Sequence, residues 1–232
     1  MAMTKTNFFI LTNLENFEIT MIYNTFVTTK IQKAKKAKLR RIFIDKRLSL
    51  SDREREIFSE KIADNFFKAF KFNDIRVLHC FLPLEKFAEV DTFLIFKRIW
   101  NEFPEIKTVV PKMNLRDNEL DSVLFNESST LEKNQWGVRE PIDSEYVSSK
   151  DIDLVILPLL CFDLRGFRVG YGKGFYDRFL SSVRQNCLKI GLSFFDPVDE
   201  IIDVSINDVK MDFCVTPDRV FNFECDSDSN RK

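Results

Sequence analysis

Histidine and paired cysteines are largely missing from this chain. The single histidine, His79, lies within the apolar run VLHCFL, so we predict a core residue rather than a metal ligand. The five cysteines are scattered, odd in number and without C-x-x-C spacing. This pattern argues against a disulfide framework or a zinc site. It favours a reducing compartment, and we expect a cytoplasmic protein.

The chain also lacks an excess of charge and any long apolar run. Its net charge of −1 creates no overall field that would attract nucleic acid or an anionic membrane. No apolar stretch approaches the roughly 18 residues that a membrane-spanning helix needs. The N-terminus lacks the basic region and cleavage site of a secretory signal. We expect no nucleic-acid or membrane partner, and a monomer or a weak dimer.

Glycine is the third scarce residue, with six in 232 residues. Four of the six nevertheless fall between positions 166 and 174, at Gly166, Gly170, Gly172 and Gly174. Glycine lets the backbone adopt positive φ and lets a ligand approach the N–H groups without a Cβ in the way. A chain so sparing of glycine indicates a special role for this segment.

The composition is ordinary for a globular protein, with 44% hydrophobic and 31% charged residues. We predict an N-terminal extension over residues 1–30, where no helical or strand period is evident. A single α/β catalytic domain follows over residues 31–222. The last residues, 223–232, form a polar tail.

Two helices are predicted near the start of the domain. The segment KIQKAKKAKLRRIFIDKR, residues 30–47, holds nine Lys or Arg with an apolar stripe, which predicts a basic amphipathic helix. A second helix begins at Ser51, because Ser51 and Glu54 have capping-box spacing. The apolar positions on this second helix are Phe58, Ile62, Phe66 and Phe70.

Strands and helices then alternate along the chain. Strands are predicted at 75–82, 106–111, near 123–125, 153–160, 188–194 and 213–216, and helices at 90–103 and 174–184. This alternation predicts a mostly parallel central sheet with helices on both faces, a Rossmann-like three-layer architecture. Ligands bind such sheets beyond the carboxyl ends of the strands, where the glycine-rich segment would lie.

The segment DLVILPLLCFDLRGFRVGYGKGFYDRFL, residues 153–180, has an apolar run before the glycines and an amphipathic segment after them. The N–H groups at a helix N-terminus attract phosphate, and Arg168 and Lys173 add positive charge. Neither the Walker A pattern nor G-x-G-x-x-G fits these residues. We predict a phosphate-binding strand–loop–helix; the alternative is a tight connection without a ligand.

Several charged residues have two readings on the sequence alone. Asp177, in the first turn after the loop, either complements the helix dipole or binds Mg²⁺. Glu89 is either an acid near a helix N-terminus or a carboxylate that accepts hydrogen bonds from a ligand. Asp208 is either a turn residue or, like Glu89, a carboxylate of a ligand site. Lys36 and Arg40 share one helix face, as a solvated surface or as a clamp for phosphates.

Taken in order, these segments resemble the 5-formyltetrahydrofolate cyclo-ligase family. The resemblance covers about residues 33–221. It is most specific over residues 153–180, against the family pattern G-x-R-L-G-x-G-x-G-Y-Y-D. Further similar segments are KAKLRR with LSLSDRERE, EVDT, VVPKM, WGVREP and NDVKMDFCVT. Phe175 departs from the family, since it stands where the first tyrosine of the Y-Y-D motif is usual.

The resemblance implies a role for particular residues. The ATP-binding residues it implies are Lys36, Arg40, Arg168, Gly170, Gly172, Lys173, Gly174, Phe175 and Tyr176. Those implied to act in catalysis are Arg168, Lys173 and Tyr176. Those implied to bind the folate are Arg40, Leu82, Glu89, Tyr171 and Phe175. The two implied Mg²⁺ ligands are Asp177 and Asp208.

The activity implied by the resemblance is ATP- and Mg²⁺-dependent cyclisation of 5-formyltetrahydrofolate to 5,10-methenyltetrahydrofolate, with release of ADP and phosphate. The γ-phosphoryl group would activate the formyl oxygen. The alternatives are a phosphate-binding α/β enzyme of another class, such as a sugar-phosphate isomerase, and an RNA-binding protein that uses the basic helix. A binding module that has lost catalysis is a third alternative.

Overall fold

The computed structural model describes residues 33–114, 117, 119–134, 137–142 and 144–223. These residues belong to one compact unit. The predicted N-terminal extension lies outside the described residues, as does the predicted tail apart from Phe223.

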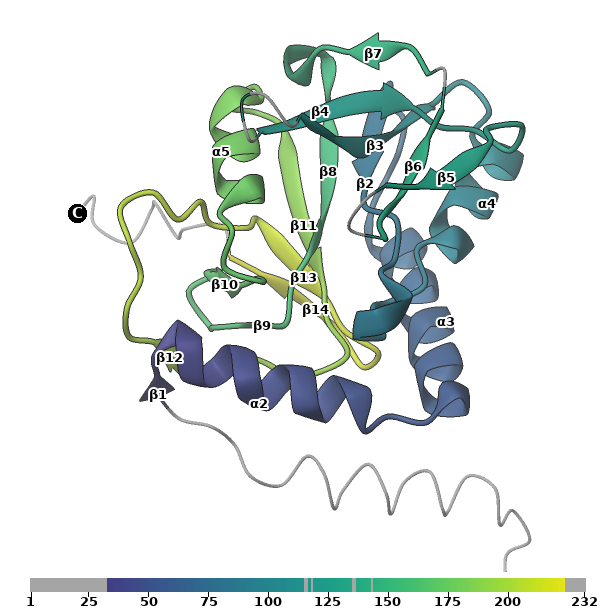
Figure 1. The fold of residues 1–232 in the computed structure, drawn as a ribbon. Coiled ribbons are helices and arrows are strands. Elements are labelled where there is room, and N and C mark those ends of the chain that lie inside the picture. Colours follow the sequence, from purple (N-terminus) through teal and green to yellow (C-terminus); the bar gives the residue numbers. More distant parts are fainter. Residues whose placement is uncertain (1–32, 115–116, 118, 135–136, 143, 224–232) are drawn as a thin grey trace, which may run out of the picture. The chain divides into compact units, whose positions relative to one another are not determined.

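The main sheet has eight strands in the order β14-β13-β11-β8-β2-β3-β4-β7 (Figure 1). The strands are β2 (Val77–Cys80), β3 (Lys107–Asn114), β4 (Glu119–Leu124), β7 (Tyr146–Val147), β8 (Leu154–Pro158), β11 (Leu188–Leu192), β13 (Phe213–Val215) and β14 (Val220–Asn222). The five strands from β13 to β3 run parallel, while β14, β4 and β7 pair antiparallel at the two sides. The predicted parallel centre is confirmed, and the antiparallel margins were not predicted.

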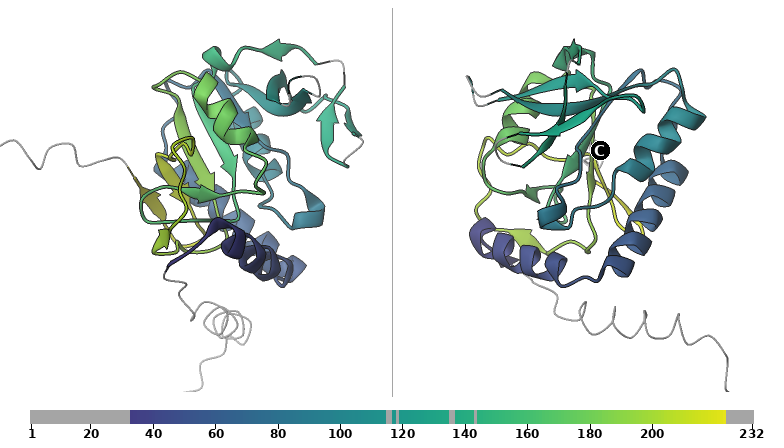
Figure 2. Two further views of the ribbon diagram at one scale, coloured as in Figure 1. Left: turned by 60° about the vertical axis from the view of Figure 1, so that its left-hand side comes forward. Right: turned by 45° about the vertical axis from the view of Figure 1, so that its right-hand side comes forward.

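Helices cover both faces of this sheet (Figures 1 and 2). Helices α3 (Asp52–Ala69) and α4 (Phe93–Glu102) pack together on one face, and α5 (Phe175–Ser182) lies on the other. The capping box that begins α3 is present, because the Glu54 N–H donates to Ser51 Oγ and the Ser51 N–H donates to Glu54 Oε2. Phe70 lies just past the helix end rather than within it.

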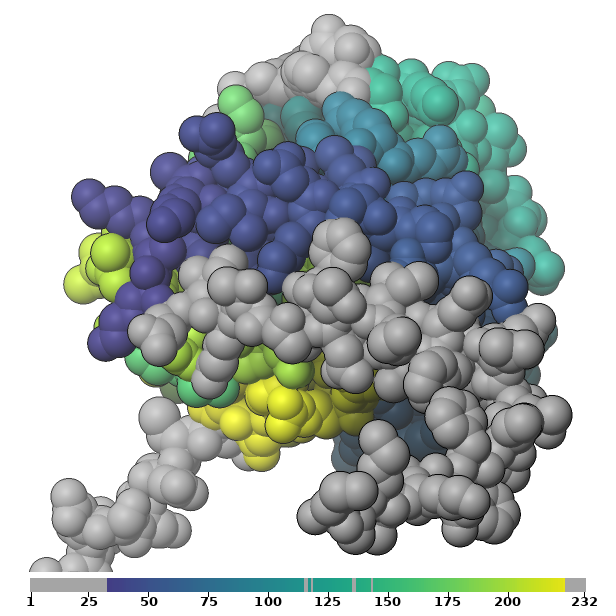
Figure 3. Space-filling model, turned by 90° about the horizontal axis from the view of Figure 1, so that it is seen from below, coloured from purple at the N-terminus to yellow at the C-terminus, as the bar shows by residue number. Residues whose placement is uncertain are grey.

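The basic helix is α2 (Lys36–Leu48), which begins several residues after the predicted start. It lies below the carboxyl ends of β8 and β11 in Figure 1 and contacts the short strands β9 (Cys161–Phe162) and β10 (Arg168–Val169). Figure 3, seen from below, shows α2 in purple across this side of the molecule. The helix buries Leu39 and Phe43, which belong to the predicted apolar stripe.

The core is rich in phenylalanine and contains the lone histidine. His79 on β2 is fully buried against Phe179, with ring centroids 4.6 Å apart, and a hydrogen bond joins its Nδ1 to Ser122 Oγ. Burial lowers the pKa of His79 to about 3, so the ring is neutral. The predicted core position is confirmed. The four cysteines among the described residues are buried and free.

The chain between β8 and α5 differs from the prediction of a simple strand–loop–helix. An antiparallel hairpin of β9 and β10 stands between them, so the glycine loop follows β10. The apolar run continues from β8 into β9, and for that reason hydrophobicity alone could not show where the sheet ends. Short elements elsewhere were also not predicted: β1 (Lys33–Ala34), β5 (Leu131–Lys133), β6 (Arg139–Pro141), β12 (Glu200–Ile201), η1 (Glu85–Phe87) and η2 (Ser149–Asp151).

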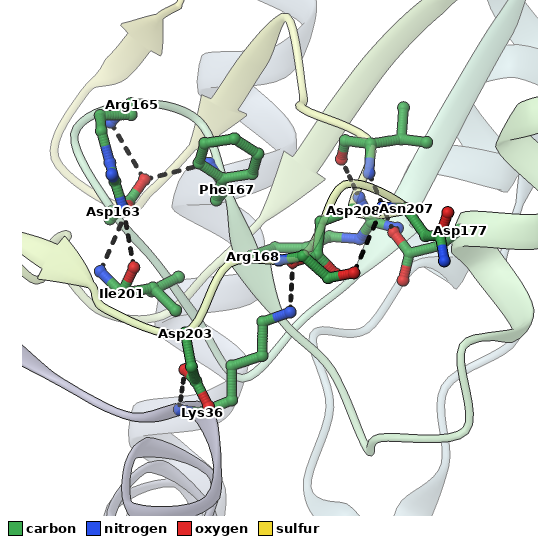
Figure 4. Close-up of polar contacts among 12 residues, drawn as sticks. Lys36, Asp163, Arg165, Phe167, Arg168, Asp177, Ile201, Asp203, Asn207 and Asp208 are labelled. Atoms are coloured by element: carbon green, nitrogen blue, oxygen red, sulfur yellow. Dashed lines mark hydrogen bonds and ion pairs between the residues drawn. The ribbon is translucent and has the colours of Figure 1, made fainter.

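A buried carboxylate holds the β9–β10 turn in place (Figure 4). Asp163 is fully buried, and its Oδ1 accepts hydrogen bonds from the backbone N–H groups of Arg165 and Phe167, each at 3.0 Å. Its Oδ2 accepts from the Arg165 guanidinium and from the Ile201 N–H at 3.1 Å. One carboxylate therefore fixes the turn and attaches it to β12.

We expect Asp163→Asn to lower the free energy of unfolding by about 2–4 kcal/mol. An asparagine amide has one acceptor oxygen, so its NH₂ group would face some of the buried donors that Asp163 now satisfies. Urea denaturation monitored by circular dichroism measures the change. Asp196→Asn is the matched control, since Asp196 pairs with Arg219 at the surface, 3.3 Å away. The control should change stability by less than about 1 kcal/mol. Equal effects of the two substitutions would contradict the structural role of Asp163.

Candidate active site

The glycine loop, residues 170–174, runs from β10 to the start of α5. Gly172 has φ of 90° and Gly174 has φ of 68°, and Gly174 forms the N-cap of α5. A Cβ on Gly172 would lie 2.9 Å from the guanidinium carbon of Arg40. The positive φ of Gly172 therefore favours glycine there, and a Cβ would also displace the Arg40 guanidinium from its present position. The N–H groups at the start of α5 have no intrahelical partners and suit an anion.

Helix α2 contributes two cations to this loop. Arg40 Nε donates to the Gly170 carbonyl at 2.9 Å, and Lys36 Nζ contacts the Asp208 carboxylate. The backbone N–H of Lys36 donates to Asp203 Oδ1 at 2.7 Å, which satisfies one N–H at the start of the helix (Figure 4). The Lys36 side chain is only 20% exposed. Lys36 and Arg40 thus belong to the site rather than to a solvated face.

Arg168 connects the glycine loop to the loop that carries Asp208. Its side chain is 6% exposed, with Nη2 donating to Asp177 Oδ1 at 2.8 Å and Nη1 donating to the Val209 carbonyl at 2.6 Å. The Val209 N–H donates to the same oxygen of Asp177. Burial lowers the pKa of Arg168, and the carboxylates of Asp177 and Asp208 oppose this shift. Asp177 therefore lies in an ion pair as well as at the start of α5.

Asp208 is also the turn residue that the sequence suggested. Its Oδ2 accepts a hydrogen bond from the Ser205 N–H at 2.6 Å, in addition to the contact with Lys36. Asp208 can be both a turn residue and a site residue, because the turn holds its carboxylate close to the Lys36 ammonium group and to the positive charge of Arg168.

A cavity of about 450 Å³ opens between these elements. Its lining includes every site residue predicted from the sequence: Lys36, Arg40, Leu82, Glu89, Arg168, Gly170, Tyr171, Gly172, Lys173, Gly174, Phe175, Tyr176, Asp177 and Asp208. The remaining lining residues are apolar: Phe81, Leu84, Pro111, Met113, Leu120, Val138 and Pro158. The cavity therefore combines a charged part around the glycine loop with an apolar part. The roles of the predicted residues stay predictions.

Glu89 is the buried carboxylate of this cavity, with 8% exposure. Its Oε1 accepts from the Tyr171 hydroxyl at 2.7 Å, and its Oε2 accepts from the Leu84 N–H at 2.9 Å. Burial raises the pKa of Glu89, while Arg47, Tyr171 and the Leu84 N–H oppose the rise. Glu89 thus has partners of its own and does not cap α4. Instead Asp91 Oδ1 accepts from the Phe93 N–H.

The aromatic residues of the loop surround the cavity in different ways. Tyr171 packs against Phe87 with ring centroids 4.5 Å apart and the rings tilted by 30°. Burial raises the pKa of the Tyr171 hydroxyl, which therefore stays protonated. The buried hydroxyl of Tyr176 has no hydrogen-bond partner among the described residues. Phe175 lies under the Arg178 guanidinium at 5.2 Å. Lys173 is exposed at the edge of the cavity.

Sequence reasoning missed two groups of residues here. Met113, Leu120 and Val138 line the apolar part, and they come from a stretch whose pattern was too irregular to place. Arg47 was one of the nine cations of the predicted basic helix and received no role of its own, yet it is 4% exposed and its guanidinium contacts the Tyr171 hydroxyl. Its spacing of seven residues from Arg40 places both on one helix face, which is the signal that could have found it.

The described residues contain no group of three or more His, Cys, Asp or Glu side chains arranged to hold a metal ion. Two carboxylates in the cavity, Asp177 and Asp208, remain as candidate cation ligands. Among the helices of the described residues, none is both long and apolar enough to cross a membrane.

The fold and the site define an α/β protein with a glycine loop at the start of a helix and a basic helix at the carboxyl edge of its sheet. Residues 32–217 match the 5-formyltetrahydrofolate cyclo-ligase family. Because this match covers most of the 232 residues, the chain belongs to that family of enzymes.

Individual relatives agree with this assignment. The mouse 5-formyltetrahydrofolate cyclo-ligase is 28% identical over 189 residues, which are 76% of this chain and 87% of the mouse protein. The solved structure of Aquifex aeolicus 5,10-methenyltetrahydrofolate synthetase is 29% identical with a TM-score of 0.70, and the match covers 82% of this chain and 93% of that one. A Mycoplasma pneumoniae structure of the same name, 22% identical with a TM-score of 0.62, shares the fold over 79% of this chain and 99% of its own.

Gly172→Ala should destabilise the protein by about 1–2 kcal/mol more than Gly170→Ala, because alanine is strained at positive φ. The Cβ would also displace Arg40, whereas a Cβ on Gly170 meets nothing within 4 Å. Urea denaturation of both variants gives the comparison. Equal unfolding midpoints would show that the close approach of α2 does not depend on Gly172.

Proposed function

We propose that the protein catalyses the ATP- and Mg²⁺-dependent cyclisation of 5-formyltetrahydrofolate to 5,10-methenyltetrahydrofolate, releasing ADP and phosphate. The observation that carries the proposal is one cavity in which a cationic glycine loop adjoins an apolar part containing a buried carboxylate. Family membership supports the same activity. We expect the enzyme to act in the cytoplasm as a monomer or weak dimer, without nucleic-acid or membrane partners.

The phosphates of ATP would lie against the glycine loop. The N–H groups at Gly174 and Phe175 begin α5 and suit phosphate oxygens. Lys36, Arg40 and Lys173 supply positive charge around the same space. Arg168 forms an ion pair with Asp177, so Arg168 would hold the glycine loop in place and add positive charge next to it. Gly170 and Gly172 keep the loop free of side chains.

The folate would occupy the apolar part. A flat heterocycle suits a space lined by Leu82, Met113 and Leu120. Each Glu89 oxygen accepts one hydrogen bond from the protein and retains capacity to accept another from ring N–H groups. Arg40, Tyr171 and Phe175 lie between the two parts, where the folate and the triphosphate would meet. Glu89 would position the substrate rather than react with it.

The residues present fit a Mg²⁺ ion bound with phosphate. Mg²⁺ in nucleotide sites takes one or two carboxylates together with phosphate oxygens and waters. Asp177 uses Oδ1 for Arg168, and Asp208 uses Oδ2 for Lys36, so each retains a second carboxylate oxygen. Bound there, the cation would neutralise charge on the phosphates.

The chemistry requires the formyl oxygen to become a leaving group. Transfer of the γ-phosphoryl group to that oxygen breaks the bond to ADP and forms an iminium phosphate. The N10 amine then attacks the formyl carbon, loses its proton, and phosphate leaves with the original formyl oxygen. The protein must align the oxygen with phosphorus and stabilise the phosphoryl charge. Lys173 and Arg168 would supply the charge, and Tyr176, which lines the same cavity, would contact the reacting groups.

Absorbance at the methenyl-folate band tests the proposal directly. Purified protein, 5-formyltetrahydrofolate and Mg²⁺ should give a rise that requires ATP. ATP binding without any rise would reject the folate chemistry and keep the phosphate loop. If neither an absorbance rise nor ATP binding is seen, only the assignment of the fold would remain. The alternatives of another phosphate-binding enzyme or an RNA-binding protein would then be tested.

Asp177→Asn should lower kcat by about 100-fold or more at ordinary Mg²⁺ concentrations, since it removes a charged ligand while keeping acceptors for Arg168 and Val209. The apparent Mg²⁺ requirement should rise. Steady-state kinetics over a Mg²⁺ titration measures both quantities, with Asp196→Asn as the surface control. Near-normal turnover at ordinary Mg²⁺ concentrations with an unchanged Mg²⁺ requirement would contradict the assignment of Asp177 as a metal ligand.

A further inference from the structure

Arg47 is a buried arginine whose partners lie beside the cavity rather than in water. It is 4% exposed near the end of α2. Its Nη1 donates to the Leu159 carbonyl at 3.1 Å, and its Nη2 donates to the Tyr171 hydroxyl. Its guanidinium carbon lies 5.8 Å from the centre of the Tyr171 ring. Burying a guanidinium costs free energy unless a nearby anion balances its charge, and Tyr171 itself is neutral. The group on the other side of the Tyr171 hydroxyl therefore matters.

That next group is Glu89. The Tyr171 hydroxyl accepts from Arg47 and donates to Glu89 Oε1 at 2.7 Å. The direction of this chain is fixed, because a guanidinium has no acceptor and an ionised carboxylate has no donor. Arg47 therefore orients the hydroxyl proton of Tyr171 toward Glu89, and the resulting hydrogen bond holds Glu89 Oε1 in position. The Leu84 N–H fixes the other oxygen.

Arg47 is separate from the residues that would touch a ligand. Tyr171 and Glu89 both line the cavity, whereas Arg47 is not among the described residues of its lining. Arg47 also carries the positive charge that opposes the effect of burial on the pKa of Glu89. Its position behind Tyr171 thus supports an anionic, oriented Glu89 without occupying the space for substrate.

We propose that Arg47 is a positioning residue for the folate, which acts through the Tyr171 hydroxyl to hold the Glu89 carboxylate in its binding orientation. The proposal rests on the proposed function. It places on α2 a determinant of folate binding in addition to the phosphate-facing Lys36 and Arg40.

Arg47→Met should raise KM for 5-formyltetrahydrofolate at least about tenfold, since hydrogen bonds to charged groups are worth that much. The KM for ATP should stay within about twofold, because Arg40 still holds the Gly170 carbonyl. Arg47→Lys should not rescue folate binding, since a single ammonium group lacks the planar fork that reaches both Leu159 and Tyr171. Arg41→Met is the matched control on the exposed side of the helix and should leave both constants unchanged.

A double-mutant cycle with Glu89→Gln separates positioning from general support of the fold. If Arg47 acts through Glu89, adding Arg47→Met to Glu89→Gln should change the folate KM by less than about twofold further. A full second loss in the double variant would overturn the proposal, as would an equal rise in both Michaelis constants.

Tyr171→Phe provides a second test that keeps the ring packed against Phe87 and removes only the hydroxyl. It should reproduce the selective rise in folate KM even if Arg47→Met fails to fold. A normal folate KM for Tyr171→Phe would overturn the proposal. If the unsubstituted protein shows no ATP-dependent conversion, the proposed function itself fails, and that result is distinct from an active enzyme indifferent to Arg47.

Discussion

The contact between helix α2 and the glycine loop is the constraint on which the site depends. Arg40 lies against Gly172 at a distance that leaves no room for a side chain, and it holds the Gly170 carbonyl. The same helix brings Lys36 to Asp208 and Arg47 to Tyr171. A glycine loop suited to phosphate must leave its N–H groups accessible, and here Arg40 of the neighbouring helix contacts two of the loop's glycines.

Two carboxylates of the described residues are each fixed by a guanidinium and a backbone N–H. Asp163 is held by Arg165 and the Ile201 N–H, and Asp177 by Arg168 and the Val209 N–H. Glu89 follows this rule through an intermediary, because Tyr171 stands between it and Arg47. The Tyr171 hydroxyl and the Leu84 N–H each give one hydrogen bond to Glu89, so both of its oxygens can accept another.

The sequence predicted the parallel centre of the sheet, the start of α3 at Ser51 and the core position of His79, since these depend on local hydrophobic pattern and capping. It could not place Lys36 beside Asp208, which lies 172 residues away, because hydrophobic period carries no information about such pairs. Only the resemblance joined these residues in one site. The β9–β10 hairpin was missed since the apolar run LLCF continues the strand before it. Arg47 was missed because a charged residue in a basic segment is usually solvated.

The separation between Lys36 and Asp208 has a consequence for the order in which the protein is made. Parallel pairing such as that of β11 with β13, and contacts between distant parts of the chain, are slow to form because long segments must first be brought together. A nascent chain on the ribosome therefore contains α2 and the glycine loop before it contains Asp208. The contact between Lys36 and Asp208 can therefore form only after β11 has been made, late in the synthesis of the domain.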